Sequence, residues 1–352
     1  MKKILIQFIF TLFCCSFLLL LLFYSDECIS LASNGLLIWY KNMIPSLFPF
    51  MVLSGFMIRS GLSLKIGQWL HPVLGLFFRL PSQMLYAIFM GFLCGFPMGA
   101  KIVADMLEKE QITLKEGEYL LAFCNNIGPL YMLGYVIPLF EYKNIGKILG
   151  LMYLIPLGYG LGLRYFSPTF STLYNSKNSH KNATRFLSFF TINSTARKNI
   201  SHDLSTCSYS KDNSPSPNYL TFFQQALSSA IEQITMLGGC MVFFNCLLIF
   251  PQILGNLFSK TTFWITSSLL NSIFSSLIEI GGGLKLLSLE FTIVNNHPSY
   301  LYLPLALLTI GGLSCIAQTY FIIKNTGLKI STYIKHKFIQ SCIYILFVVL
   351  SL

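Results

Sequence analysis

Long apolar stretches separated by short polar ones make up most of this chain. A membrane-spanning helix needs about 20 consecutive apolar residues, and seven stretches approach or exceed that length. They cover residues 4–24, 83–104, 118–140, 145–166, 220–250, 302–323 and 338–352, of which the last is short. This pattern predicts an all-α polytopic membrane protein.

Three further apolar stretches contain residues that disfavour a continuous helix. Pro45 and Pro49 interrupt residues 36–58, and three glycines interrupt residues 263–289. Residues 66–80 carry Trp, His, Pro and Arg, as interfacial segments do. Broken helices survive inside a membrane where protein or a water-filled cavity satisfies their backbone. We therefore expect about eight to ten membrane segments, including broken or re-entrant helices.

A polar segment, residues 167–218, divides the chain into two apolar halves. It is rich in Ser, Asn, Lys and Pro, which is typical of flexible linkers, and we expect it in the cytoplasm. The predicted organisation is an N-terminal anchor span (1–28), a first repeat (29–166), the linker, and a second repeat (219–352).

The two halves are weakly alike. GFLCGFPMGAK, from Gly91 to Lys101, and GGLSCIAQT, from Gly311 to Thr319, both interrupt an apolar stretch with small residues. Paired interruptions are typical of transporters built from repeats, with the binding site between the repeats. If residues 36–58 and 263–289 both re-enter rather than cross, the basic loops lie inside and the two broken helices have the same direction, whereas an inverted repeat needs opposite directions. One assigned span then conflicts with the repeat, and residues 263–289 are the first candidate. The topology of residues 36–58 and 263–289 therefore stays open.

Charged residues are scarce, and this excludes several classes of protein. Asp, Glu, Lys and Arg make up 11% of the 352 residues and hydrophobic residues 54%, with a mean hydropathy of +0.64. Soluble domains carry about 25% charged residues, so a cytosolic enzyme or a nucleic-acid-binding protein is not expected. The net charge of +11 instead indicates topology, because Lys and Arg collect on cytoplasmic loops. We expect the N-terminus, residues 177–211 and residues 324–337 on that side.

Signatures of enzymes and metal sites are missing from the sequence. The ten cysteines form no CxxC pair, and HExxH, GxxxxGK[ST] and GxSxG are absent. We expect no enzyme, no metal and no cofactor. The partners expected are a small-molecule anion and the lipid bilayer, with no nucleic acid and with a homo-oligomer left open.

The sharpest candidate for a binding site is GFPMGAK, residues 95–101. Gly95, Pro97 and Gly99 disfavour a continuous helix, and Lys101 follows in the first turn of the helix that resumes. Free backbone N–H groups and a lysine at a helix N-terminus favour an anion. The alternative is a kinked span whose Lys101 reaches the interface.

Other polar residues in apolar surroundings extend this candidate site. Two adjacent amides, Asn125 and Asn126, are costly in a membrane unless they bond each other, a neighbouring helix or a substrate. We expect one to tie helices together and the other to face a cavity. Ser46 lies in IPSLFPF, and Gln318 ends the glycine-rich stretch of the second half. Structural roles remain the alternative for each.

Two carboxylates are candidates for ion coupling or proton relay. Glu279 precedes three glycines, and Glu232 lies in the apolar stretch 220–250. Carboxylates inside a membrane are functional by default, and one of them is also a candidate partner for Lys101. The alternative for Glu232 is a position near the end of its helix.

Together these motifs resemble the sporulation integral membrane protein YlbJ family, also called SpoVV. The resemblance rests on W-x5-PSLFPF, GFLCGFPMGAKIVADM and E-x4-AFCNNIGP in order, and extends more loosely to GGLSCIAQ. That family is grouped with nucleoside-recognition Gate proteins, which are similar to concentrative nucleoside transporters. The resemblance implies the outer forespore membrane of a sporulating bacterium and transport of dipicolinic acid, a planar dicarboxylate.

Two other functions remain open from the sequence. One is a membrane scaffold that recruits spore-envelope partners through residues 167–218. The other is a nucleoside transporter, which the wider fold family suggests. Passive or ion-coupled transport, and its direction, are not decided by the residues.

Overall fold

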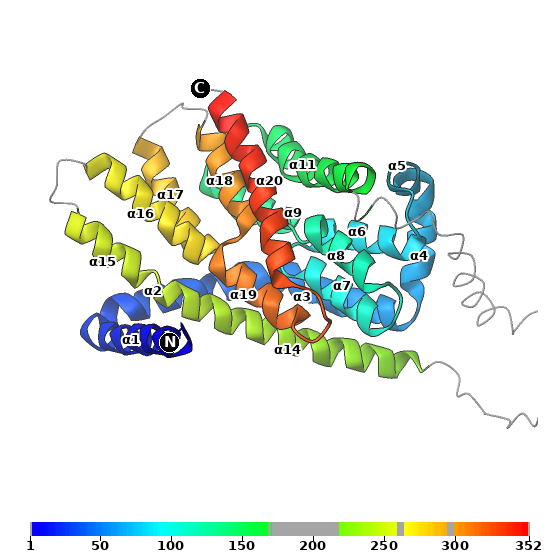
Figure 1. The fold of residues 1–352 in the computed structure, drawn as a ribbon, viewed down its shortest axis with the longest axis horizontal. Helices are drawn as coiled ribbons and strands as arrows, with labels where there is room; N and C mark the ends of the chain where they lie inside the picture. The colour runs from blue at the N-terminus through cyan, green and yellow to red at the C-terminus, as the bar shows by residue number, and fades with distance from the viewer. Residues whose placement is uncertain (1, 168–169, 171–217, 259–263, 294–298, 351–352) are drawn as a thin grey trace, which may run out of the picture.

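A computed structural model describes residues 2–167, 170, 218–258, 264–293 and 299–350 (Figure 1). Across these residues the chain forms helices and no strand, which confirms the prediction of an all-α polytopic membrane protein. Six helices are long and apolar enough to span a membrane, or seven if a bent pair counts as one span. The predicted linker, residues 167–218, lies almost wholly outside the described residues.

The elements before the linker run in this order. They are α1 (Lys2–Phe23), α2 (Ser25–Ile38), π-helix η1 (Trp39–Met43), α3 (Ile44–Arg59), α4 (Leu62–Leu70), π-helix η2 (His71–Gly75), α5 (Leu76–Phe78), α6 (Ser82–Cys94), α7 (Met98–Glu108), α8 (Leu114–Cys124), α9 (Pro129–Tyr131), π-helix η3 (Met132–Val136), α10 (Ile137–Leu139) and α11 (Ile145–Phe166). After the linker come α14 (Tyr219–Cys246), α15 (Ile249–Phe258), α16 (Trp264–Ile278), α17 (Ile280–Ile293), α18 (Ser299–Ile310), α19 (Gly312–Ile323) and α20 (Ile330–Leu350).

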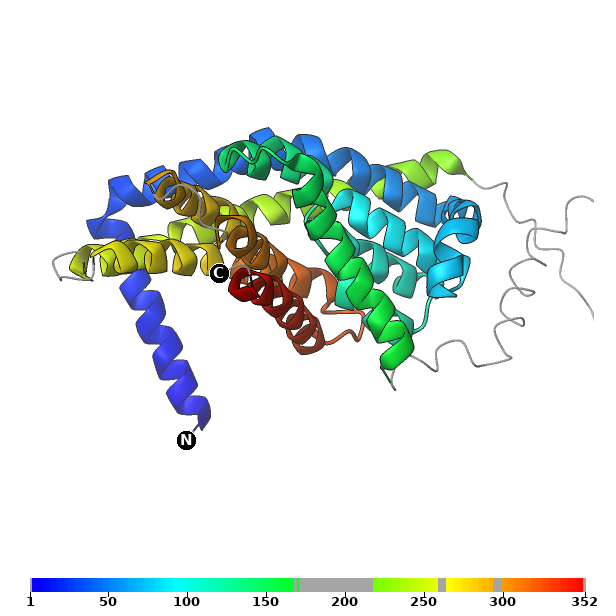
Figure 2. The same cartoon turned by 90° about the horizontal axis from the view of Figure 1, so that it is seen from above.

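The N-terminal helix α1 projects from the rest of the molecule (Figure 2). Most of its apolar side chains are exposed, as in a helix that faces lipid. Its contact with the body is aromatic, because Phe13 and Phe17 stack on Phe250 of α15.

The expected break at Pro45 and Pro49 does not occur. Helix runs from Ser25 to Arg59 through α2, η1 and α3, because the wider π-helical turn directly before Pro45 accommodates the proline ring. This long helix packs along α14. Trp39 fixes the contact by donating from Nε1 to the carbonyl of Ile234 at 2.9 Å.

Residues 83–104 form a helical hairpin rather than the expected single span. A Cβ added to Gly91 of α6 or to Gly99 of α7 would lie 2.6 or 2.5 Å from the same carbonyl oxygen, that of Cys124. Both helices therefore lie against one point on α8, and α7 turns back beside α6.

A second hairpin joins α16 to α17, which lie side by side (Figure 1). The turn is at Glu279 and not at Gly281 to Gly283, which lie in the first turns of α17. Gly283 instead allows close packing of the two helices, because a Cβ there would lie 2.2 Å from the backbone nitrogen of Ser276.

Each hairpin tip meets an interrupted helix. Residues 125–128 separate α8 from α9, and Gly311, at φ +77°, separates α18 from α19. A Cβ on Gly95 would lie 2.3 Å from the nitrogen of Gly128, and one on Gly312 would lie 2.8 Å from the oxygen of Ser276. The backbones of hairpin and interruption thus touch directly in both parts of the chain.

Both parts of the chain share an order of elements: long helix, hairpin, interrupted helix, long helix. The two motifs compared in the sequence occupy different elements of this order. GFLCGFPMGAK lies in a hairpin, whereas GGLSCIAQT lies in an interrupted helix, so pairing them was wrong. The repeat itself stays a prediction.

The last helix, α20, begins at Ile330 and not near residue 338. It packs against α18, α19 and α8, so it lies in the body of the protein. Lys337, which we expected in a cytoplasmic loop, is therefore part of a helix and is 2% exposed.

Candidate functional site

The hairpin tips and the interrupted helices enclose a small cavity. Its volume is about 30 Å³, measured as the space open to the centre of a water molecule. Three predicted residues from distant parts of the chain line it together, namely Ser46 of α3, Glu279 between α16 and α17, and Gln318 of α19. The cavity accommodates about one water molecule, so any larger solute requires its walls to move apart.

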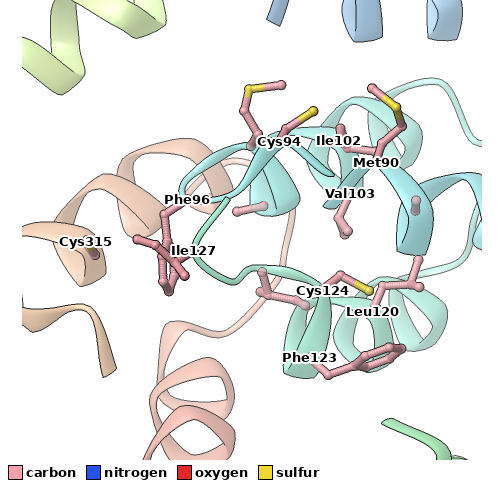
Figure 3. Close-up of a cluster of buried hydrophobic side chains, with 14 of the residues drawn as sticks. Met90, Cys94, Phe96, Ile102, Val103, Leu120, Phe123, Cys124, Ile127 and Cys315 are labelled. Carbon is pink, nitrogen blue, oxygen red and sulfur yellow. The ribbon is translucent and has the colours of Figure 1, made fainter. Parts of the chain in front are cut away.

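Close approach of two backbone segments builds one wall of this cavity. Gly95 has φ +89° and ψ −171°, a conformation that is essentially restricted to glycine. The approach of Gly95 to Gly128 brings Phe96 and Ile127 together, with Cys315 of α19 facing them (Figure 3). All three side chains line the cavity.

Asn125 ties three elements together beside this wall. Its Oδ1 accepts a hydrogen bond of 3.2 Å from the backbone nitrogen of Ala100 in α7. Its Nδ2 donates to Thr319 Oγ1 of α19 at 3.1 Å and to Tyr333 Oη of α20 at 3.2 Å. The amide is fully buried and uses both its oxygen and its nitrogen, so it has a structural role here.

Asn126 makes a different contact, with a buried lysine. Its Nδ2 donates to the carbonyl of Phe123 at 2.5 Å, and its Oδ1 accepts a 2.6 Å hydrogen bond from Lys337 Nζ. The same ammonium lies 5.3 Å from the centre of the Phe96 ring and 6.0 Å from that of Tyr333. Among the described residues, Lys337 has no carboxylate within 4.0 Å of its ammonium.

Lys337 was missed because the sequence places it in a basic run, Lys335-His336-Lys337, which reads as a loop. The spacing of the residues around Lys337 did indicate a helix with one buried face. Tyr333, Lys337, Gln340 and Tyr344 recur at intervals of three or four residues, and all are buried.

The predicted anion site at the start of α7 is filled by the protein. The nitrogens of Met98 and Gly99 donate to Gly95, that of Ala100 to Asn125, and that of Lys101 to Pro97. The Lys101 ammonium pairs with Asp105 one turn further along α7. No N–H group of this first turn is left for a ligand.

Lys101 and Glu232 line a second cavity, which shares no lining residue with the first. This cavity lies between α7, α14 and α19, and its open volume is about 800 Å³. It is bordered by charged groups of both signs, including Glu108 and Lys324. The structure thus separates Lys101 and Glu232 from Ser46, Glu279 and Gln318.

Glu279 caps the N-terminus of α17. Its Oε1 accepts from the nitrogen of Gly281 at 3.0 Å and its Oε2 from that of Gly282 at 2.6 Å. The side chain is 1% exposed, and the positive end of the helix dipole favours its negative charge. It was also a candidate partner for Lys101, but the two are not paired.

The two uncharged predicted residues at the cavity keep bonding capacity. Ser46 donates from Oγ to the carbonyl of Asn42 at 2.6 Å, and Gln318 donates from Nε2 to Ser314 Oγ at 3.0 Å. Each still has an oxygen able to accept from a solute. Among the residues described, no group of three or more His, Cys, Asp or Glu side chains is suited to a metal ion.

Comparison with known proteins identifies a relative. The chain is 28% identical over 267 residues to the sporulation integral membrane protein YlbJ of Bacillus subtilis (strain 168). This match confirms the resemblance to the YlbJ family. The match spans 73% of this chain and 62% of YlbJ, less than two thirds of its length.

Two further comparisons gave no match. No family model matches the chain, and no solved structure matches it. The similarity to YlbJ and the apolar helices support a multi-pass membrane protein. The likeness to nucleoside transporters stays a prediction.

Proposed function

We propose that this protein carries a small anionic solute across a membrane during sporulation, and that the solute is dipicolinic acid crossing the outer forespore membrane. One observation supports an anion above all. Lys337 is buried at the interruption of α8 and has no carboxylate partner among the described residues. An uncompensated buried charge is costly, and an anionic solute would supply the missing charge.

The surroundings of Lys337 suit a planar dicarboxylate. Phe96 lines the cavity, and the centre of its ring lies 5.3 Å from the Lys337 ammonium. The Phe96 ring therefore lies between the ammonium and the cavity. An aromatic face offers a surface on which a pyridine ring can stack. Gln318 of α19 and Ser46 of α3 add hydrogen-bonding groups to the lining of the same cavity.

The arrangement of the backbone supports a carrier. Interrupted helices at the centre of a membrane protein are typical of secondary transporters, and here two such helices meet two hairpin tips. The space in the cavity is smaller than the proposed solute, so passage needs the hairpins to move relative to the long helices. The similarity to a sporulation membrane protein supports a role during sporulation.

Uptake into vesicles tests the proposal. The full chain is reconstituted into liposomes, and accumulation of labelled dipicolinate is compared with that of labelled uridine and with protein-free liposomes. We expect dipicolinate to accumulate well above the protein-free level, with little uridine. Uridine uptake without dipicolinate uptake would favour the nucleoside transporter, and uptake of neither would favour a scaffold.

A further inference from the structure

A helix from Leu62 to Phe78, made of α4, η2 and α5, is bent by 90° from α6. It lies at one end of the molecule (Figure 1). It begins directly after the turn that ends the long spanning helix at Arg59. Because α6 enters the membrane as one half of a hairpin, a helix at a right angle to α6 runs along the membrane surface. We call residues 62–78 the surface helix.

Two contacts place the surface helix on the side of the linker. Near the end of α11, directly before the linker, Tyr165 Oη donates to the carbonyl of Phe77 at 2.7 Å. Near the end of α3, the ring of Phe56 lies 6.5 Å from that of Tyr219, the first residue of α14 after the linker. The basic linker predicts this side to be cytoplasmic, and the cytoplasmic leaflet carries anionic lipids.

One face of the surface helix is buried against the protein. Its buried residues, Ser63, Gly67, Gly75 and Phe78, have the spacing of a single helical face. A Cβ on Gly67 would lie 1.9 Å from the carbonyl oxygen of Ser82, the first residue of α6. The surface helix is therefore packed closely on the start of the first hairpin.

The other face of the surface helix is apolar and exposed. Trp69, Val73 and Leu76 are 79%, 63% and 71% exposed, and they are three or four residues apart, as neighbours on one helix face are. We call these three residues the apolar face. Tryptophan and aliphatic side chains at this level of a membrane sit between the headgroups and the hydrocarbon.

Exposed cations accompany the apolar face. Lys65 lies one turn before Trp69, and Arg79 directly follows the surface helix. Among the described residues, neither has a carboxylate within 4.0 Å. The sequence contains no Asp or Glu between Glu27 and Asp105, so the surface helix is basic throughout. Cations beside an apolar face complement the phosphate groups and acyl chains of anionic lipids.

We propose that the surface helix is a binding site for anionic phospholipids of the linker-side leaflet. Lys65 and Arg79 contact the lipid phosphates, and the apolar face inserts among the acyl chains. Leu80 and Pro81 join the surface helix to α6, so bound lipid holds the end of α6 that is opposite the hairpin tip. This site is independent of the solute that the protein carries.

Thermal unfolding in the presence of lipid tests the site. The purified full chain is melted in detergent with increasing amounts of phosphatidylglycerol, or of phosphatidylcholine, which has no net charge. A ligand of the folded protein stabilises it, and we expect phosphatidylglycerol to raise the melting temperature by about 5 °C more than phosphatidylcholine. In Lys65→Gln/Arg79→Gln, half of this effect should need about 25-fold more phosphatidylglycerol, since each cation contributes about fivefold in affinity.

A matched variant separates the site from the general attraction of a basic protein for anionic lipid. Lys143→Gln/Lys147→Gln removes two exposed cations at the start of α11, the end away from the linker, and should respond to phosphatidylglycerol as wild type does. Equal stabilisation by the two lipids, or an equal loss in both double variants, would overturn the site. The same stabilisation by soluble glycerol phosphate would show a simple anion site and would also overturn the lipid surface.

Fluorescence tests whether lipid covers the apolar face. The chain is reconstituted in phosphatidylglycerol liposomes whose acyl chains carry bromine near the headgroup, and tryptophan quenching is compared in wild type and Trp69→Phe. Trp39 and Trp264 remain in the variant, so the difference isolates Trp69. We expect stronger quenching in wild type. Equal quenching would mean that a second copy or another protein covers Trp69, and would contradict the proposal.

Discussion

Lys337 Nζ donates a 2.6 Å hydrogen bond to Asn126 Oδ1, and this contact joins the last helix to the interruption of α8. The two residues are 211 positions apart in the chain. Their neighbour Phe96 comes from the tip of the first hairpin and faces the same ammonium. One buried lysine thus lies where three separate elements meet, and the proposed function depends on it.

Two adjacent glycines on α14 offer a matched test of how α14 packs against the helix that runs from Ser25 to Arg59. A Cβ on Gly238 would lie 2.5 Å from the Trp39 ring, whereas one on Gly239 would meet nothing within 4 Å. Overpacking costs about 2 kcal/mol, so Gly238→Ala should lower the melting temperature by about 5 °C. Gly239→Ala should leave it unchanged in the same thermal-unfolding measurement. Equal melting temperatures for the two variants would contradict the packing.

The crossing of hairpin and interrupted helix should be intolerant of side chains. Gly95→Ala combines a backbone conformation reserved for glycine with a contact of 2.3 Å to the nitrogen of Gly128. We expect a loss of about 3 kcal/mol or more, visible as a sharp fall in folded protein on size-exclusion chromatography. Gly134→Ala, where the methyl group meets no atom within 4 Å, is the control. A normal yield of Gly95→Ala would rule out the close crossing.

Lys101 and Gln318 should differ in their effect on transport. Gln318 lines the small cavity at the hairpin tips. Lys101 pairs with Asp105 and lines the second cavity. Gln318→Met should raise the KM for dipicolinate about fivefold, the equivalent of one hydrogen bond, and Lys101→Met should change it by less than about twofold. Uptake kinetics in liposomes measure both values. The reverse order would place the solute at the second cavity.

Much of the helical architecture could be predicted from apolar length alone. The spans 4–24 and 145–166 agree with α1 and α11 to within a few residues, because lipid-facing helices must be apolar along their whole length. Hairpins were harder to predict. A re-entrant helix pair such as α6 and α7 has the same apolar composition as one long span, and only tertiary contacts distinguish the two.

The candidate site was predicted in part. Ser46, Glu279 and Gln318 come together as polar residues in apolar surroundings, which is a local signal. We expected one of Asn125 and Asn126 to tie helices together and the other to face a cavity. Asn125 does tie three elements together, but Asn126 lines neither of the two cavities described above and bonds Lys337 instead. The importance of Lys337 could not be read from charge, because a charged residue in a short polar run looks the same in a loop and in a buried turn of helix.

The central claim is that the charge of Lys337 recruits an anionic solute. At about 8 Å and an effective dielectric constant of about 20, a unit charge stabilises an anion by about 2 kcal/mol, or about 30-fold in affinity. Lys335, two residues away on α20, is exposed and provides the matched control. Lys337→Arg keeps the charge and serves as a second variant if Lys337→Met folds poorly.

The most direct measurement is therefore the KM for dipicolinate uptake by wild type, Lys337→Met, Lys337→Arg and Lys335→Met in liposomes with equal amounts of folded protein. The account predicts a KM about 30-fold higher for Lys337→Met, a smaller change for Lys337→Arg, and a wild-type value for Lys335→Met. A wild-type KM in folded Lys337→Met, or an equal loss in Lys337→Arg, would contradict it.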